Sequence, residues 1–399
     1  MRIYFSVPTM SVTSMVSVDP DGGRLKALRE LHGLTQIELS KQVGIRQSVI
    51  SDIEKGRRRL TPDSAVSISQ RLRVPLSFFE QPNRRIEDAA VSFRKTAGAS
   101  ASSTTAAVRR LLEAERLCST LLDRFDQRPA GLPLAHSDFP LSGEELEVLA
   151  AQTREALGVP HSEPVRHVMR ALERSGIAVV PLSSGDDAVA HAMDGHSGIT
   201  EGVRPNGTAV VGYVPTTAGD RQRLTIAHEL GHIVLHSART VPVVKEREAE
   251  AMRFAGAFLY PAEVATKDLS ETVSLNGYVR LKAQWGTSIQ ALIRRGHDLA
   301  LISPARYKSL SIQVSSRGWR KEEPVEVGQE QPALMWALLT RGYGHTPYAR
   351  ASHELGVEPE FLKTWIPERQ SPAKKSHAPA EPPARGGDVV DFRSPRQRR

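Results

Sequence analysis

The stretch TIAHELGHIVLH, from Thr225 to His236, constrains the fold of this chain more strongly than any other segment. His228 and His232 are four residues apart, so on a helix both imidazoles project from one face, one turn apart. Two nitrogens in that arrangement can reach one Zn²⁺ at about 2.0–2.1 Å, and Glu229 is placed to act on a water molecule beside it. The pattern therefore predicts a helix that carries two metal ligands and a general base.

His236 repeats the four-residue spacing but is badly placed to complete a metal site. It lies two turns from His228, about 12 Å along a straight helix axis, so three imidazoles would not converge on one ion. A longer motif with Gly and a third His after the second His is also excluded, because Leu235 and Ala238 occupy those positions. We expect His236 to end the helix and a third ligand to come from a second helix.

The following segment, KEREAEAMRFAGAFLYP, offers Glu246, Glu248 and Glu250 as the third ligand. With about 100° per residue, Glu248 falls within roughly 40° of the centre of the apolar stripe, Glu250 about 120° away, and Glu246 on the far side. A carboxylate on an apolar face is costly unless it is paired or binds a metal. Helical phase therefore selects Glu248. The stripe consists of Ala251, Met252, Phe254, Ala255, Phe258 and Leu259.

Four short helical patterns occur between Gly23 and Pro82. GLTQIELSKQVG predicts the second helix, with Thr35 as its N-cap and Gly44 as its end, and a tight turn leads into RQSVISDIEKG. Two short helices joined in this way are typical of the helix-turn-helix, whose second helix enters the major groove of DNA. Residues 24–59 hold nine Lys or Arg against four Asp or Glu, which favours a polyanionic partner. A small helical protein-binding module is the alternative.

Between these two motifs the pattern changes from helical to mixed. A helical apolar stripe starts at Val108 and includes Cys118, the only cysteine, which we interpret as a core residue. Residues 165–175 predict another helix, and GIAVVPL and TAVVGYV are typical of β-strands. The single cysteine excludes an intrachain disulfide, and no apolar run is long enough to cross a bilayer. With no export signal in MRIYFSVPTMSVTSMV, these features favour the cytoplasm.

The C-terminal part of the chain leaves several interpretations open. SHELGV, residues 352–357, repeats HELG, but Val357 replaces the second His, so no zinc site is expected there. The segment QPALMWALLTRGYGHTPYARASHELGVEPEFLKTW predicts three short helices that form a second helix-turn-helix-like module, a lid, or a packing partner for the preceding domain. The tail from Ser371 holds seven Lys or Arg against three acidic residues, and either solvated disorder or a polyanion-binding segment fits it.

The segment GLTQIELSKQVGIRQSVISDIEKG resembles the Cro/C1 (XRE-type) repressor domain almost position by position. The resemblance implies that Gln36, Gln47 and Ser48 face DNA, with Arg46 and Ser51 flanking them. The chemistry agrees, because Gln can bond adenine bidentately and Arg can anchor phosphates. A double-stranded DNA operator is therefore the expected partner, and a homodimer is the default because half-sites are usually paired.

RQRLTIAHELGHIVLH and EREAEAMRFAGAFLYP resemble the ImmA/IrrE family of zinc metallopeptidases. The resemblance implies that His228, His232 and Glu248 bind Zn²⁺ and that Glu229 is catalytic. Met252 departs from the family pattern, in which Asn is usual, and this weakens any inference about hydrogen bonds behind the ligands. The motifs VSFRK and GWRKEEP also occur in fused XRE–ImmA/IrrE regulators.

We therefore expect a multidomain protein, with an all-α helix-turn-helix domain, an α+β zincin-like domain and a small helical C-terminal region. The expected function is that of a DNA-binding transcriptional regulator carrying a zinc-dependent endopeptidase, which cleaves a protein substrate such as a repressor or itself. The alternative is a transcription factor whose zincin-like domain is a non-proteolytic sensor or dimerisation module. The expected segments are a disordered leader at 1–22, the DNA-binding domain at 23–86, a linker at 87–107, the metallopeptidase domain at 108–303, the helical region at 304–370 and a disordered basic tail at 371–399.

Overall fold

The computed structural model describes residues 22–86, 101–127, 131–137, 139–183, 198–204, 207–239, 241 and 243–369. Most of the expected leader, part of the expected linker with its VSFRK motif, and the basic tail lie outside the described residues. In the described part of the chain, no helix combines the length and the apolar character needed to span a membrane.

Residues 22–86 form the short helices that the sequence predicts. Thr35 caps the second helix, because its hydroxyl accepts the N–H of Glu38 while the Glu38 carboxylate accepts the N–H of Thr35. Gly44 ends that helix with φ 72°, a left-handed conformation that glycine adopts without strain. The elements are α1 (Gly23–Leu31), α2 (Gln36–Val43), α3 (Gln47–Glu54), α4 (Pro62–Leu72) and the 3₁₀ helix η1 (Leu76–Glu80).

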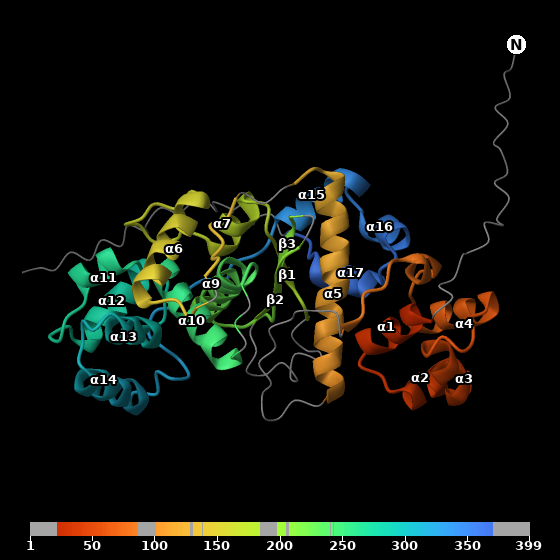
Figure 1. Cartoon of the computed structure of the whole chain (residues 1–399), viewed down its shortest axis with the longest axis horizontal. Helices are drawn as coiled ribbons and strands as arrows, with labels where there is room; N and C mark the ends of the chain where they lie inside the picture. Colours follow the sequence, from red (N-terminus) through yellow and green to blue (C-terminus); the bar gives the residue numbers. More distant parts are fainter. Residues whose placement is uncertain are drawn as a thin grey trace, which may run out of the picture. The chain divides into compact units, whose positions relative to one another are not determined.

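Helix α5 (Ala101–Arg124) packs against α1 and β3 (Figure 1). It begins before the expected Val108, because the small residues of ASSTTAA are compatible with a helix and Ala106 is buried in the core. Arg24 of α1 donates to Glu113 of α5 at 2.5 Å, and both side chains are buried. Burial raises the pKa of Glu113, but the positive charges of Arg24 and Arg116 outweigh burial and lower the pKa to about 2. A charged pair thus ties α1 to α5.

The sheet has three described strands, β1 (Ala178–Pro181), β2 (Gly198–Val203) and β3 (Ala209–Tyr213), in the order β1-β3-β2. Strand β1 runs parallel to β3, and β2 runs antiparallel to it. Alternate side chains enter different cores, since Val180 packs with α5 and the N-terminal helices whereas Val179 packs with helix α9 (Gly219–His236). Helices therefore cover both faces of the sheet.

Strands β1 and β3 confirm the prediction from GIAVVPL and TAVVGYV, whereas β2 was not predicted. The sequence of β2, GITEGV, contains two glycines and a glutamate and lacks a β-branched run. Strand β2 lies at one edge of the sheet and packs against α9, so tertiary contacts compensate for its low intrinsic preference.

Two further cores complete the fold. One lies between the sheet and four helices, in which α10 packs against both α9 and α6. The other lies among the next four helices, which follow α10 in the chain. The first four are α6 (Gly143–Ala156), α7 (Val168–Arg174), α9 (Gly219–His236) and α10 (Val244–Leu259). The next four are α11 (Ala262–Asp268), α12 (Leu275–Trp285), α13 (Ile289–Asp298) and α14 (Pro304–Ser316).

The three predicted C-terminal helices, α15 (Leu334–Tyr343), α16 (Tyr348–Leu355) and α17 (Pro359–Trp365), are present. They pack against α5, β1 and η1 and share the hydrophobic core of the N-terminal helices. Arg124 of α5 donates to the hydroxyl of Tyr343 at 2.8 Å. Their contacts are those of a packing partner. Because α14 packs on α13 instead, the region expected as one helical unit contributes to two different cores.

Candidate metal centre and DNA-binding surface

The expected metal ligands meet where α9 and α10 pack together. The Nε2 atoms of His228 and His232 are 3.1 Å apart. That of His228 lies 3.4 Å from Oε2 of Glu248, and that of His232 lies 3.4 Å from Oε1 of the same carboxylate. A tetrahedral zinc ion with bonds of about 2.0–2.1 Å holds its ligand atoms about 3.3 Å apart. The three donors therefore fit a zinc ion. Among the described residues, these three side chains form a group that could hold a metal ion, and their ligand atoms all lie within 4.8 Å of one another.

Gly231, the glycine of HELGH, allows α9 and α10 to approach closely. A Cβ atom at this position would lie 3.0 Å from the carbonyl oxygen of Ala251 and 3.1 Å from Cδ1 of Phe254. Both distances are shorter than ordinary van der Waals contacts, so a side chain here would push α10 away. The glycine thus helps to place Glu248 within reach of both histidines.

The expected burial of α10 is wrong at Glu250 and Met252, whereas the other residues of the stripe are buried as expected. The side chain of Glu250, expected far from the apolar stripe, is 8% exposed, whereas that of Glu248 is 18% exposed. Met252, expected on the buried face, is 43% exposed. The reason is that α10 also packs against α6, and Leu141, just before α6, donates its N–H to Glu250 at 2.9 Å. Glu248 faces the histidines from the more open side of α10.

His236 ends α9, as expected, and it also contacts His232. The Nδ1 atoms of the two rings are 3.0 Å apart, and Nε2 of His236 lies 3.1 Å from Oε2 of Glu250. Arg239 donates to the same glutamate oxygen at 3.1 Å, and its side chain is fully buried. Because Nε2 of His232 faces Glu248 and its Nδ1 faces His236, these contacts define the orientation of the His232 ring.

Burial determines the charges within the cluster. It raises the pKa of Glu229 to about 7, an effect that the charge of Glu248 adds to and that His228 opposes. Burial also lowers the pKa of His232, which favours the neutral imidazole that a metal ligand requires. Burial raises the pKa of Glu248 as well, but hydrogen bonds from His228 and His232 outweigh this effect. The net result is a lowered pKa, so the carboxylate is charged.

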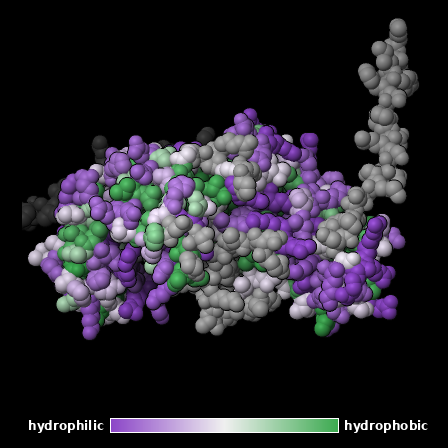
Figure 2. Space-filling view, viewed as in Figure 1, coloured by the Kyte–Doolittle hydropathy of each residue, from purple (hydrophilic) through white to green (hydrophobic). Residues whose placement is uncertain are grey.

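Of the residues expected to contact DNA, Gln36 begins α2, Arg46, Gln47 and Ser48 lie at the start of α3, and Ser51 lies in the middle of α3. Arg46, Gln47 and Ser48 are exposed, and Gln36 and Ser51 are half-buried. On the face shown in Figure 2, hydrophilic residues predominate over the N-terminal helices. These positions are therefore accessible to a partner.

Hydrogen bonds hold the two glutamines in place. The Gln47 amide donates to the side-chain oxygen of Gln36 at 2.7 Å, and the Gln36 amide donates to Glu54 at 2.8 Å. Glu54 in turn accepts two hydrogen bonds from Arg29, at 2.6 and 2.9 Å. This chain of contacts restricts the orientation of the two side-chain amides.

Two family models match the chain. Residues 25–79 match the model described as helix-turn-helix, and residues 172–297 match the peptidase model described as the IrrE N-terminal-like domain. The chain joins a helix-turn-helix domain to an IrrE N-terminal-like domain. Both resemblances inferred from the sequence are confirmed, and so is the expected fold class. No curated protein matches the chain.

Two arginines before HELGH, Arg221 and Arg223, and Tyr260 at the end of α10 differ in what they contact. Arg223 is buried and donates to Glu330 at 2.6 Å, and Tyr260 donates its hydroxyl to Asp268 at 3.0 Å. Both side chains therefore have polar partners outside the metal cluster. Arg221 is exposed instead.

Proposed function

We propose that this DNA-binding regulator is also a peptidase. Its IrrE N-terminal-like domain would hydrolyse peptide bonds of a protein substrate, with a zinc ion held by His228, His232 and Glu248. The observation that carries the proposal is the convergence of these three donors, with spacings that suit a tetrahedral ion. Glu229 lies next to the first ligand in the chain and is buried beside the cluster. The domain therefore has the residues that metal-assisted hydrolysis requires.

Each residue has a distinct role in the proposed reaction. A zinc ion bound here would supply a Lewis acid that lowers the pKa of a water molecule towards about 7 and polarises the scissile carbonyl. The carboxylate of Glu229 accepts the proton of the attacking water and delivers it to the nitrogen of the leaving amine. His236 holds His232 in the ring orientation that directs Nε2 at the cluster.

Zinc content tests the proposed ligands directly. Purified wild type is expected to contain one zinc ion per chain, and His228→Ala and Glu248→Ala are expected to lose it, because each leaves only two of the three protein ligands of a catalytic zinc site. Elemental analysis after dialysis measures this. Glu246→Ala, an exposed glutamate on the same helix, is the matched control. An unchanged zinc content in Glu248→Ala would assign the third ligand to another residue.

Gly198 of β2 is a position where one added methyl group should impair hydrolysis. Its Cβ would lie 2.7 Å from both Cγ and Oε1 of Glu229, which is buried and has little room to move. We expect Gly198→Ala to keep its zinc and to lower the hydrolysis rate by about 100-fold, because the base is displaced. Gly143→Ala is the control, since a Cβ there meets nothing within 4 Å. Equal rates in the two variants would contradict the predicted displacement.

The proposed DNA contacts make a separate prediction. Gln47→Ala is expected to relax base preference, at a cost of about 1–3 kcal/mol for the preferred site, with little change in salt dependence. Binding-site selection on randomised duplexes, followed by salt titration, measures both quantities. Gln42→Ala, an exposed glutamine of α2, is the control. An unaltered site profile would remove Gln47 from base recognition.

The proposed partners follow from the two domains. The helix-turn-helix domain is proposed to bind a double-stranded DNA operator as a homodimer, through Gln36, Arg46, Gln47, Ser48 and Ser51. The peptidase substrate is proposed to be a protein, either a repressor or the chain itself. Binding to an operator would concentrate the peptidase close to a DNA-bound substrate.

A further inference from the structure

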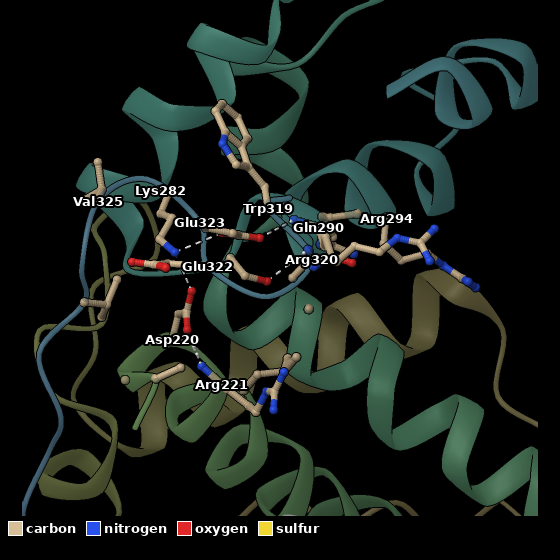
Figure 3. Close-up of a pocket in the computed structure, with 18 of the residues that line it drawn as sticks. Asp220, Arg221, Lys282, Gln290, Arg294, Trp319, Arg320, Glu322, Glu323 and Val325 are labelled. Carbon is tan, nitrogen blue, oxygen red and sulfur yellow. Dashed lines mark hydrogen bonds and ion pairs between the residues drawn. The ribbon is translucent and has the colours of Figure 1, made fainter. Parts of the chain in front are cut away.

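A pocket lies between the helices that carry the proposed metal ligands and the helices that follow them in the chain. It has a volume of about 550 Å³, within the range of small-molecule and side-chain binding sites. Its walls come from the start of α9, from α10, from α12 and α13, and from residues 319–327. In Figure 3, Arg221 and Trp319 lie on opposite sides of this pocket.

The pocket has wall residues one helical turn from the metal donors on both α9 and α10. Leu224, on the pocket wall, lies one turn before His228 on α9. Met252, also on the wall, lies one turn after Glu248 on α10. Residues four apart share a helix face, so on each helix this part of the pocket wall lies one turn from a metal donor. The exposure of Met252, which departs from the sequence prediction, is explained by its position in this pocket.

The charged residues of the pocket fall into two groups. In the first group, Lys282 pairs with Asp220 at 2.6 Å and with Glu323 at 2.9 Å. Arg294 similarly pairs with Asp298 at 2.8 Å. These contacts fix the pocket wall, and because Lys282 faces two carboxylates, this group keeps one net negative charge. Figure 3 shows Lys282, Asp220 and Glu323 together on one side.

The second group carries a surplus of positive charge. The six charged side chains of this group are exposed, and among the described residues none forms an ion pair with a nitrogen–oxygen distance of 4 Å or less. The cations are Arg221, Arg253, Arg320 and Lys321, and the anions are Glu322 and Glu326. Leu224, Met252 and Trp319 add apolar surface between the charges. Such a lining suits a carboxylate on a short aliphatic stem.

We propose that this pocket binds an acidic side chain of the protein substrate and thereby makes the peptidase selective for acidic segments. The inference rests on the proposed function. An extended peptide advances about 3.3–3.6 Å per residue, so a residue a few positions from the scissile bond can reach a pocket one helical turn from the ligands. The chain would bind this glutamate or aspartate through Arg221 and Arg253, which extend from α9 and α10 respectively.

Peptide binding tests the pocket separately from catalysis. The full chain with zinc and the substitution Glu229→Gln is mixed with fluorescent hexaglutamate or hexaglutamine, and anisotropy gives the dissociation constants. Excess duplex DNA occupies the basic helix-turn-helix surface. We expect hexaglutamate to bind at least roughly ten-fold more tightly, and Arg221→Gln/Arg253→Gln to remove that preference, since it deletes two charge-assisted contacts.

A matched double variant controls for net charge. Arg280→Gln/Lys308→Gln removes two exposed positive charges outside the pocket and should retain the preference for hexaglutamate. Equal affinity for the two peptides, or an equal loss in both double variants, would overturn the proposal. Hydrolysis of a peptide library by the wild-type protein is measured in a separate assay from binding. Acidic peptides that bind through the pocket without being cleaved would defeat the proposed function and leave the binding site intact.

Discussion

Glu229→Gln is expected to leave the zinc content unchanged and to lower peptide hydrolysis by about 10²–10⁴-fold. The amide has nearly the shape of the carboxylate, so it fits the same buried space beside Gly198. It cannot accept a proton from the attacking water, and the reaction loses its base. The folded protein should tolerate the change well, because burial already raises the pKa of Glu229 to about 7 and partly neutralises it.

Three readouts make this prediction decisive. Zinc content and thermal unfolding show whether the site and the fold persist, and a quenched-fluorescence peptide library measures hydrolysis. Glu246→Gln, on the exposed side of α10, provides the same chemical change away from the cluster. Cleavage that persists in Glu229→Gln would assign the base to another group. A wild type that holds zinc and cleaves nothing would favour a non-proteolytic sensor or dimerisation module.

Glu250→Ala is expected to have the largest effect on stability. The variant leaves the buried guanidinium of Arg239 without its carboxylate and removes the partner of His236. Breaking one side of a buried ion pair typically lowers the free energy of unfolding by about 3–5 kcal/mol. Because His236 orients His232, we also expect zinc affinity to fall by about 10–100-fold.

Urea denaturation of the metal-free protein and zinc competition with a chelator measure these two effects separately. Glu250→Gln should be intermediate in both, since the amide oxygen can still accept a hydrogen bond from Arg239 but carries no charge. Glu246→Ala should change neither quantity by more than about 0.5 kcal/mol, as expected for a surface substitution. If stability falls while zinc affinity stays constant, the contacts of Glu250 serve the fold alone.

Local patterns in the sequence predicted the elements that carry the site. Thr35 and Gly44 specify the ends of α2 through hydrogen bonds and backbone angles within a few residues. The four-residue spacing of His228 and His232 places both rings on one helix face for the same reason, because helix geometry is local. Glu248 could be selected from phase, although the burial argument behind that choice was wrong.

Only the tertiary structure decided what surrounds those residues. Strand β2 has a weak sequence signal and is held by contacts with β3 and α9, which bring Gly198 against Glu229. The burial of Glu250 depends on α6, which lies far away in the sequence, and the periodicity of α10 alone cannot report a second packing partner.

The same limit applies to the pocket and to the C-terminal helices. The charged residues of the pocket come from separate segments of the chain. The fold determines which of them form ion pairs, and therefore which cations have no acidic partner. The sequence of α15–α17 predicts helices but leaves their partner open, and the structure packs them on α5, β1 and η1. The sequence by itself determined the motifs and their chemistry, because these depend on spacing within one helix. Packing between distant elements determined access, burial and orientation.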